Sequence, residues 1–118
     1  MGVIEVSGIR AFGYHGCLPE EARIGGRYRI DVRVEGDFTE AERSDDLRDT
    51  IDYGRVTAIV REQLTIRSAL IEQVARRILD NLQAAWPGEY SWRVRLVKEH
   101  PPVDGAVDEV AYMLESRS

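Results

Sequence analysis

Lys98 is the only lysine in the chain, whereas the other 15 cationic residues are arginine. An arginine stays protonated in proteins, but a lysine can lose its proton in a suitable pocket. Lys98 shares one face of an expected strand with three apolar residues, Trp92, Val94 and Leu96. An amine buried there can donate and accept protons near neutral pH. The alternative is a lysine whose head reaches solvent at the end of the strand.

Four other residues have side chains that could take part in chemistry. Glu72 lies near the start of a helix, where the helix dipole favours a carboxylate and where it can also grip the N–H groups of a planar heterocycle. Tyr53 begins another helix, either as a packing aromatic or as a stacking ring or phenolic acid. Glu20 and Glu21 are neighbours in a glycine-bounded segment, a pair that is usually only solvated. The residue types alone do not decide between a structural and a functional role for these residues.

Metal, thiol and nucleotide chemistry find little support. His15 and Cys17 are two positions apart and His100 is distant, which is a weak pattern for zinc or for a Cys–His nucleophile. The acidic stretch 45–52 lacks the spacing of a calcium loop. No phosphate-binding or dinucleotide glycine motif is present. We therefore expect no metal site.

Length and composition restrict the class of protein. A chain of 118 residues is expected to form a single domain over 1–118. A net charge of −5 argues against nucleic-acid binding, and one cysteine excludes an intrachain disulfide. No apolar run is long enough to span a membrane and the first residues do not resemble a signal peptide, so the expected location is cytoplasmic.

Residue periodicity predicts the elements that position these side chains. Alternation predicts strands over 3–12, with a bend or bulge at Gly8, and over 27–38, joined by a loop over 16–26. A capping-box pattern, with Thr39 leading, predicts a short helical turn.

The second half changes period twice. Apolar residues at helical spacing predict helices over about 53–65, capped by Asp52, and over about 68–86. Alternation returns over 91–99 and 107–115, which we expect to be strands. The order β-β-α-α-β-β indicates an α+β fold with an antiparallel four-stranded sheet. Two helices cover only one face, which leaves a polar, arginine-containing face for contact between subunits.

Four segments together carry a resemblance to a known family. The chain resembles the dihydroneopterin aldolases of folate biosynthesis from Val3 to Glu115. The four segments are GYHGCLPEE with IG (residues 13–21 and 24–25), SDDL with DTIDY (44–47 and 49–53), LIE before VA (70–72 and 74–75) and KEHPP (98–102). Each segment is weak alone, but their order and spacing on the same β-β-α-α-β-β frame are specific.

The resemblance implies a fold, an assembly and a reaction. The fold is the tunnelling fold (T-fold), in which four subunits join their sheets into a barrel and two rings stack into an octamer with sites between subunits. The family needs no metal or organic cofactor. Its reaction is a retro-aldol cleavage of 7,8-dihydroneopterin, a pterin, to 6-hydroxymethyl-7,8-dihydropterin and glycolaldehyde.

The resemblance also implies a role for each candidate residue. Lys98 matches the catalytic lysine of the proton network that deprotonates the 2′-hydroxyl. Tyr53 matches the tyrosine that protonates the intermediate and lies against the pterin from the neighbouring subunit. Glu72 matches the carboxylate that holds the pterin amino and ring N–H groups, with backbone contact from Ile71. Glu21 matches the glutamate that meets the hydroxylated side chain.

Two departures and two alternatives remain open. Residues 101–105 and 65–69 differ from the usual family sequences and can reshape the rim of the pocket. An epimerase of dihydroneopterin or its triphosphate shares the fold and the mechanism, and Arg23 and Arg27 are available for a triphosphate. A non-catalytic pterin-binding module would keep Glu72 but would not need a lysine at 98.

Overall fold

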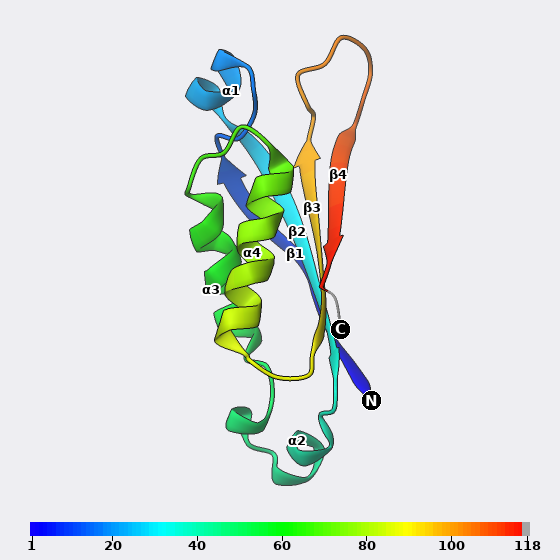
Figure 1. Ribbon diagram of the computed structural model, residues 1–118. Helices are drawn as coiled ribbons and strands as arrows, with labels where there is room; N and C mark the ends of the chain where they lie inside the picture. Colours follow the sequence, from blue (N-terminus) through cyan, green and yellow to red (C-terminus); the bar gives the residue numbers. More distant parts are fainter. Residues whose placement is uncertain (117–118) are drawn as a thin grey trace.

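The computed structural model of the protein describes residues 1–116. Its four strands form one antiparallel sheet in the order β1-β2-β3-β4 (Figure 1). The elements are β1 (Gly2–Gly13), α1 (Pro19–Ile24), β2 (Gly26–Gly36), α2 (Thr39–Ser44), the 3₁₀ helix η1 (Leu47–Asp49), α3 (Tyr53–Leu64), α4 (Ile71–Ala85), β3 (Ser91–Glu99) and β4 (Glu109–Glu115). The expected β-β-α-α-β-β order and α+β class are confirmed.

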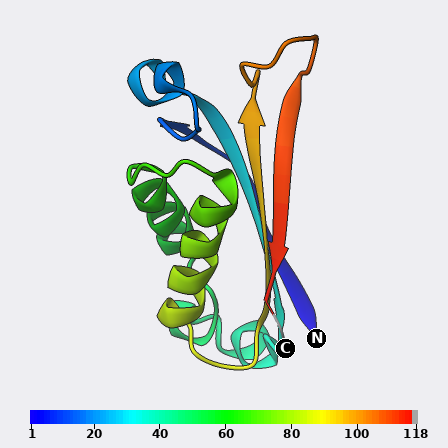
Figure 2. The same ribbon diagram turned by 45° about the horizontal axis from the view of Figure 1, so that its top comes forward.

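The two long helices lie side by side on one face of the sheet (Figures 1 and 2). From Tyr28 to Gly36, every second residue of β2 is buried, and the residues between them are half-buried. This alternation follows from the two-residue period of a strand. The helices contribute buried residues at 3.6 spacing, so the core forms between them and the sheet. Its members include Tyr28, Ile30, Val56, Val60, Val74, Ile78, Leu79 and Leu96.

The opposite face of the sheet carries charged side chains, as predicted. Arg29 pairs with Glu109 at 3.4 Å, and Arg95 approaches Asp31 at 3.9 Å. Such half-exposed pairs contribute little to stability, typically about 0–1 kcal/mol each. Among the described residues, no helix is long and apolar enough to cross a membrane.

The predicted bend in the first strand is confirmed. The pairing of β1 with β2 changes register between Val6 and Ile9, and Gly8 has a φ of 72°. Glycine adopts this conformation without the steric cost that a side chain adds. The bulge keeps Ile9 on the core face beyond the register change.

The expected loop over 16–26 is wrong, because it contains α1. Pro19 occupies the first turn of this helix, where its missing N–H needs no partner, and Glu20 and Glu21 suit the same turn electrostatically. Pro19 was interpreted as a loop residue, whereas here it starts a helix. The change matters because α1 carries Glu21 into the site described below.

Three predicted boundaries also need correction. The capping box led by Thr39 does not form: Phe38 precedes the helix, and Asp37 accepts the Thr39 N–H at 3.0 Å. The second long helix begins at Ile71 rather than near residue 68, and the last strand begins at Glu109 rather than at 107. The predicted cap by Asp52 is confirmed, since its carboxylate accepts the N–H groups of residues 54 and 55.

The helix directions set which residues can meet. In Figure 1, α3 starts at the α2 end of the molecule, whereas α4 starts at the other end, where α1 lies and where β3 finishes. The start of α4 and the end of β3 therefore lie at the same end of the molecule, and the start of α3 lies away from them, on the side of α2.

Candidate active site

A lysine–glutamate pair forms the centre of the candidate site. Lys98, near the end of β3, donates from Nζ to Oε2 of Glu21 on α1. Their side chains are only 13% and 12% exposed. Two opposite charges that are this well removed from water interact much more strongly than a surface pair. The expectation that Lys98 lies on an apolar face is confirmed, and the alternative of a side chain reaching freely into solvent is not.

Glu21 is held in its ionised form. Burial opposes its charge, but hydrogen bonds from Lys98 and from the Leu18 N–H, with the positive charges of Lys98 and Arg67, outweigh that effect and lower its pKa. Gly16 approaches closely: it has a φ of 143°, and a Cβ added there would overlap the Glu21 carboxylate. The glycine at this position thus leaves room for the carboxylate beside the amine.

The backbone carbonyl of His15 is the second acceptor of the lysine. Lys98 Nζ donates to it at 3.0 Å, and the hydroxyl of Tyr28 donates to the same oxygen at 3.0 Å. A carbonyl oxygen has two lone pairs and accommodates both donors. Tyr28 and Lys98 are direct cross-strand partners on β2 and β3, which explains why both reach one atom.

The His15 ring joins two segments that lie far apart in sequence. It is 1% exposed; its Nδ1 accepts the Ser68 N–H at 3.1 Å, and its Nε2 lies 3.1 Å from the Leu64 carbonyl oxygen. This pattern fits the neutral ring with its proton on Nε2. Burial, with the nearby positive charges, lowers the pKa of His15, against the opposing hydrogen bond to Leu64. The ring therefore acts as a structural link.

Two arginines reinforce the connection between α3 and α4. Arg67 donates to the Gly16 carbonyl at 2.7 Å. Arg77, on α4, donates to the carbonyls of Ile66 at 2.6 Å and of Gln63 at 3.1 Å, and to the Ser68 hydroxyl. These bonds fix the segment that leads into α4.

Glu72 and Ile71 open α4 at the same end of the molecule as α1 and the end of β3 (Figure 1). Glu72 is exposed and lies in the first turn, as predicted, while Ile71 is half-buried. An exposed carboxylate beside free N–H groups of a helix start can meet both donors and acceptors of a ligand.

Tyr53 does not join these residues within one chain. It is the first residue of α3 and is 70% exposed. The start of α3 lies at the end of the molecule opposite to α1 (Figure 1). A site that contains both Tyr53 and Lys98 therefore requires two copies of the chain.

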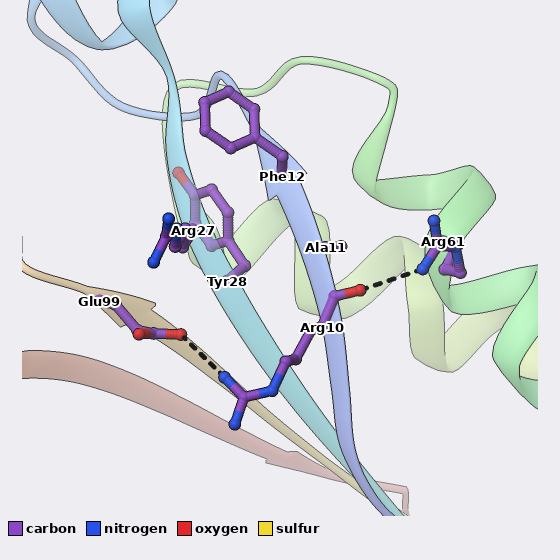
Figure 3. A pocket seen from close by; sticks show the side chains of 7 residues that line it. All are labelled: Arg10, Ala11, Phe12, Arg27, Tyr28, Arg61 and Glu99. Atoms are coloured by element: carbon purple, nitrogen blue, oxygen red, sulfur yellow. Dashed lines mark hydrogen bonds and ion pairs between the residues drawn. The ribbon is translucent and has the colours of Figure 1, made fainter.

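A surface hollow of about 390 Å³ adjoins the site without enclosing it. Figure 3 shows its lining, which includes Phe12, Arg27, Tyr28 and Glu99 but neither Lys98 nor Glu21. Among residues 1–116, no three His, Cys, Asp or Glu side chains are grouped closely enough to hold a metal ion. The hollow of a single chain therefore does not include the Lys98–Glu21 pair.

Sequence reasoning missed Tyr28 and gave His15 no structural role. Both belong to the core around Gly13, where an added Cβ would lie 2.8 Å from the His15 ring and 3.1 Å from the Tyr28 ring. The signal was present as a histidine between two glycines, a pattern that indicates close packing. It was interpreted only for metal and thiol chemistry.

The sequence is similar to one family of known proteins. A family model described as "FolB: Dihydroneopterin aldolase" matches residues 4–115. The dihydroneopterin aldolase of Staphylococcus epidermidis is 37% identical over 109 residues, 92% of this chain and 90% of that protein. The Streptococcus pyogenes enzyme is 34% identical over 116 residues, 98% of each chain.

A solved structure shows the same fold. The crystal structure of E. coli dihydroneopterin aldolase in complex with neopterin superposes with a TM-score of 0.90. The match covers 99% of this chain and all of that one at 22% identity, and it confirms the expected T-fold subunit. The chain belongs to the dihydroneopterin aldolase family, and its enzymatic activity is the dihydroneopterin aldolase activity of folate biosynthesis.

Proposed function

We propose that the chain carries out its reaction by proton transfer through Lys98 and Glu21, on a pterin held by Glu72 and Ile71 and completed by Tyr53 of a second copy. The substrate is 7,8-dihydroneopterin, and the products are 6-hydroxymethyl-7,8-dihydropterin and glycolaldehyde. The buried Lys98–Glu21 pair is the observation that supports this best.

The reaction breaks the C1′–C2′ bond of the substrate side chain. The 2′-hydroxyl gives its proton to the Lys98–Glu21 pair, where the ionised Glu21 carboxylate accepts it. The hydroxyl oxygen becomes the carbonyl of glycolaldehyde, and the bonding electrons move toward the C=N bond of the dihydropterin ring. A proton then adds at C1′ to give the hydroxymethyl group. Since the ring accepts the electrons, no Schiff base, metal or organic cofactor is required, and the protein must only move protons and hold geometry.

The pair is suited to that task. Lys98 donates to two groups that only accept, the carboxylate of Glu21 and the carbonyl of His15. An ammonium has three N–H groups, so one remains for a water or a substrate hydroxyl. Glu21, kept ionised, is the acceptor that meets the hydroxylated side chain.

The recognition of the pterin ring falls to the start of α4. Glu72 accepts the amino and ring N–H groups as a bidentate partner, and the backbone of Ile71 adds a contact. The bonds that Arg67 and Arg77 make to the segment before α4 hold this region in place. The E. coli relative was crystallised with neopterin, a pterin.

The site requires an oligomer. Tyr53 begins α3 at its α2-facing end, away from the end of β3 that carries Lys98 (Figure 1), so a neighbouring subunit must supply it, stacking on the pterin and protonating the intermediate. Strands β1 and β4 are the free edges of the sheet, and edge pairing between subunits closes such sheets into a barrel. We expect four subunits in a ring and two rings in an octamer.

Product analysis tests the proposal. Wild-type protein is incubated with 7,8-dihydroneopterin without added metal, beside Lys98→Ala. Release of hydroxymethyl-dihydropterin and glycolaldehyde by the wild type, with pterin binding but almost no turnover by the variant, supports the role of Lys98. Inversion of the side chain without cleavage indicates the epimerase. Equal turnover by the two proteins overturns the assignment.

A mixing experiment tests the shared site. The Lys98→Ala and Tyr53→Phe proteins should each have almost no activity on their own. When the two are unfolded together and refolded, some interfaces combine an intact Lys98 with an intact Tyr53, and activity returns to about a quarter of wild type for random pairing. No recovery above the separate variants contradicts a site formed between subunits.

A further inference from the structure

We propose that Tyr28 is a positioning residue for Lys98: its hydroxyl takes one lone pair of the His15 carbonyl and confines the lysine amine to the other, beside Glu21. This inference rests on the proposed proton transfer by Lys98. Tyr28 itself touches no substrate in this arrangement, and it acts through the amine.

The geometry places both donors on one acceptor. Tyr28 and Lys98 face each other across β2 and β3, and each donates to the His15 oxygen at 3.0 Å. In Figure 3 the Tyr28 hydroxyl points away from Arg10 and Glu99, which line the same hollow. The hydroxyl thus faces the end of the sheet at which Lys98 and Glu21 meet.

The peptide group of the His15 carbonyl, which accepts both hydrogen bonds, is itself held in place by neighbouring residues. The peptide group that carries the His15 oxygen carries the Gly16 N–H, which donates to the Ser68 carbonyl at 3.1 Å. The His15 ring is fixed by Ser68 and Leu64, and it packs edge-on against the Tyr28 ring with 5.1 Å between centroids. The peptide plane is therefore fixed, and the free choice that remains is which lone pair the amine uses.

The tyrosine is a permanent donor. Its side chain is 1% exposed, and burial together with the charge of Glu21 raises the pKa of Tyr28 to about 12, against the opposing bond to His15. The hydroxyl therefore stays protonated wherever the enzyme works. Phenylalanine would fill the same space without the donor, so the position allows the hydroxyl to be tested separately from the ring.

The test is Tyr28→Phe, with Tyr90→Phe as the matched control. Tyr90 is a half-buried tyrosine that packs on Phe38 and Trp92 at the start of β3, far from Lys98 along the strand. Freed of its competitor, the amine samples both lone pairs, so kcat should fall roughly fivefold, the size expected for one lost neutral hydrogen bond. KM should stay within twofold, since Glu72 and Ile71 hold the ring, and the control should match wild type.

Two further readouts separate positioning from a structural role. Combined with Lys98→Ala, Tyr28→Phe should have no additional effect on the residual rate, because its effect passes through the lysine. Lysine-selective ¹³C labelling reports on Lys98 alone, as the chain has no other lysine. Its two Cε protons should give distinct signals in wild type and a merged signal in Tyr28→Phe.

The outcomes are distinguishable from failure of the proposed function. If wild type does not cleave dihydroneopterin, the proposed function fails, and the Cε signals still decide whether Tyr28 fixes the amine. If wild type cleaves and Tyr28→Phe keeps its kcat and distinct Cε signals while melting at a lower temperature, Tyr28 is only structural. A rise in KM at constant kcat likewise overturns the inference, because it indicates a role in binding.

Discussion

Replacing His15 by leucine should lower the free energy of unfolding by more than the loss of one packed ring would, because two buried backbone groups lose their partners. The leucine fills a similar apolar space but leaves the Ser68 N–H and the Leu64 carbonyl without their partners. Both residues are nearly fully buried. An unpaired buried backbone group costs about 1–3 kcal/mol, so the two together should lower the free energy of unfolding by about 4 kcal/mol at pH 7.5. Urea unfolding at one fixed protein concentration measures this.

The pH dependence gives the sharper test. The pKa of His15 is lowered from its ordinary value of 6.5 in the folded state, mainly by burial. Folding then favours the neutral ring, so its contribution is complete above pH 6.5 and is lost as the pH falls toward the folded-state pKa. His15→Leu lacks this titration. The gap in unfolding free energy between wild type and variant should therefore shrink from pH 7.5 to pH 5.

A matched histidine serves as the control. His100 is exposed and has a φ of 47°, a conformation that asparagine tolerates. His100→Asn should change the unfolding free energy by less than about 0.5 kcal/mol at either pH, as surface substitutions generally do. A gap for His15→Leu that stays constant or widens in acid would refute the assignment of a neutral, doubly bonded ring.

Three other perturbations have defined outcomes. Asp52→Ala removes the cap of α3 and should lower the unfolding free energy by about 1 kcal/mol in urea titrations, with exposed Asp104→Ala near zero. Gly16→Ala forces a Cβ into the Glu21 carboxylate and should reduce kcat at least tenfold, whereas Gly26→Ala, with open space around it, should not; equal rates would contradict the contact. Glu21→Gln should lower both kcat and unfolding free energy at neutral pH. Because the pKa of Glu21 lies below its ordinary 4.5, that stability difference should narrow as the pH falls below 4.5, and a constant difference would argue against an ionised partner.

The sequence predicted the parts of the fold in which one face is buried. Strand β3 was located to the residue, and α3 to within one residue, because their side chains follow a strict period against a single core. Lys98 was recognised as unusual from its place in that period. Family resemblance then supplied the roles of Glu21, Tyr53 and Glu72, which periodicity alone left open.

The remainder depends on contacts between distant segments. Helix α1 buries no residue of its own, so it has no apolar period to detect. The link from His15 to Ser68 and Leu64 joins positions about 50 apart, and no local pattern encodes such a bond. Tyr28 follows the alternation of β2 as one more core residue, but the role of its hydroxyl depends on the His15 carbonyl that it contacts.

The structure gives a physical reason why the chain has a lysine at position 98 and arginine at its other 15 cationic positions. Several arginines of the described chain form ion pairs or donate to backbone carbonyls, tasks for which arginine is well suited. At Lys98 the cation must fit between a carboxylate and a carbonyl that already accepts from Tyr28, with one proton left for chemistry. A planar guanidinium is wider than an ammonium and presents its N–H groups in a fixed fork. A compact ammonium fits between these two acceptors, which gives a physical reason for a lysine at this position.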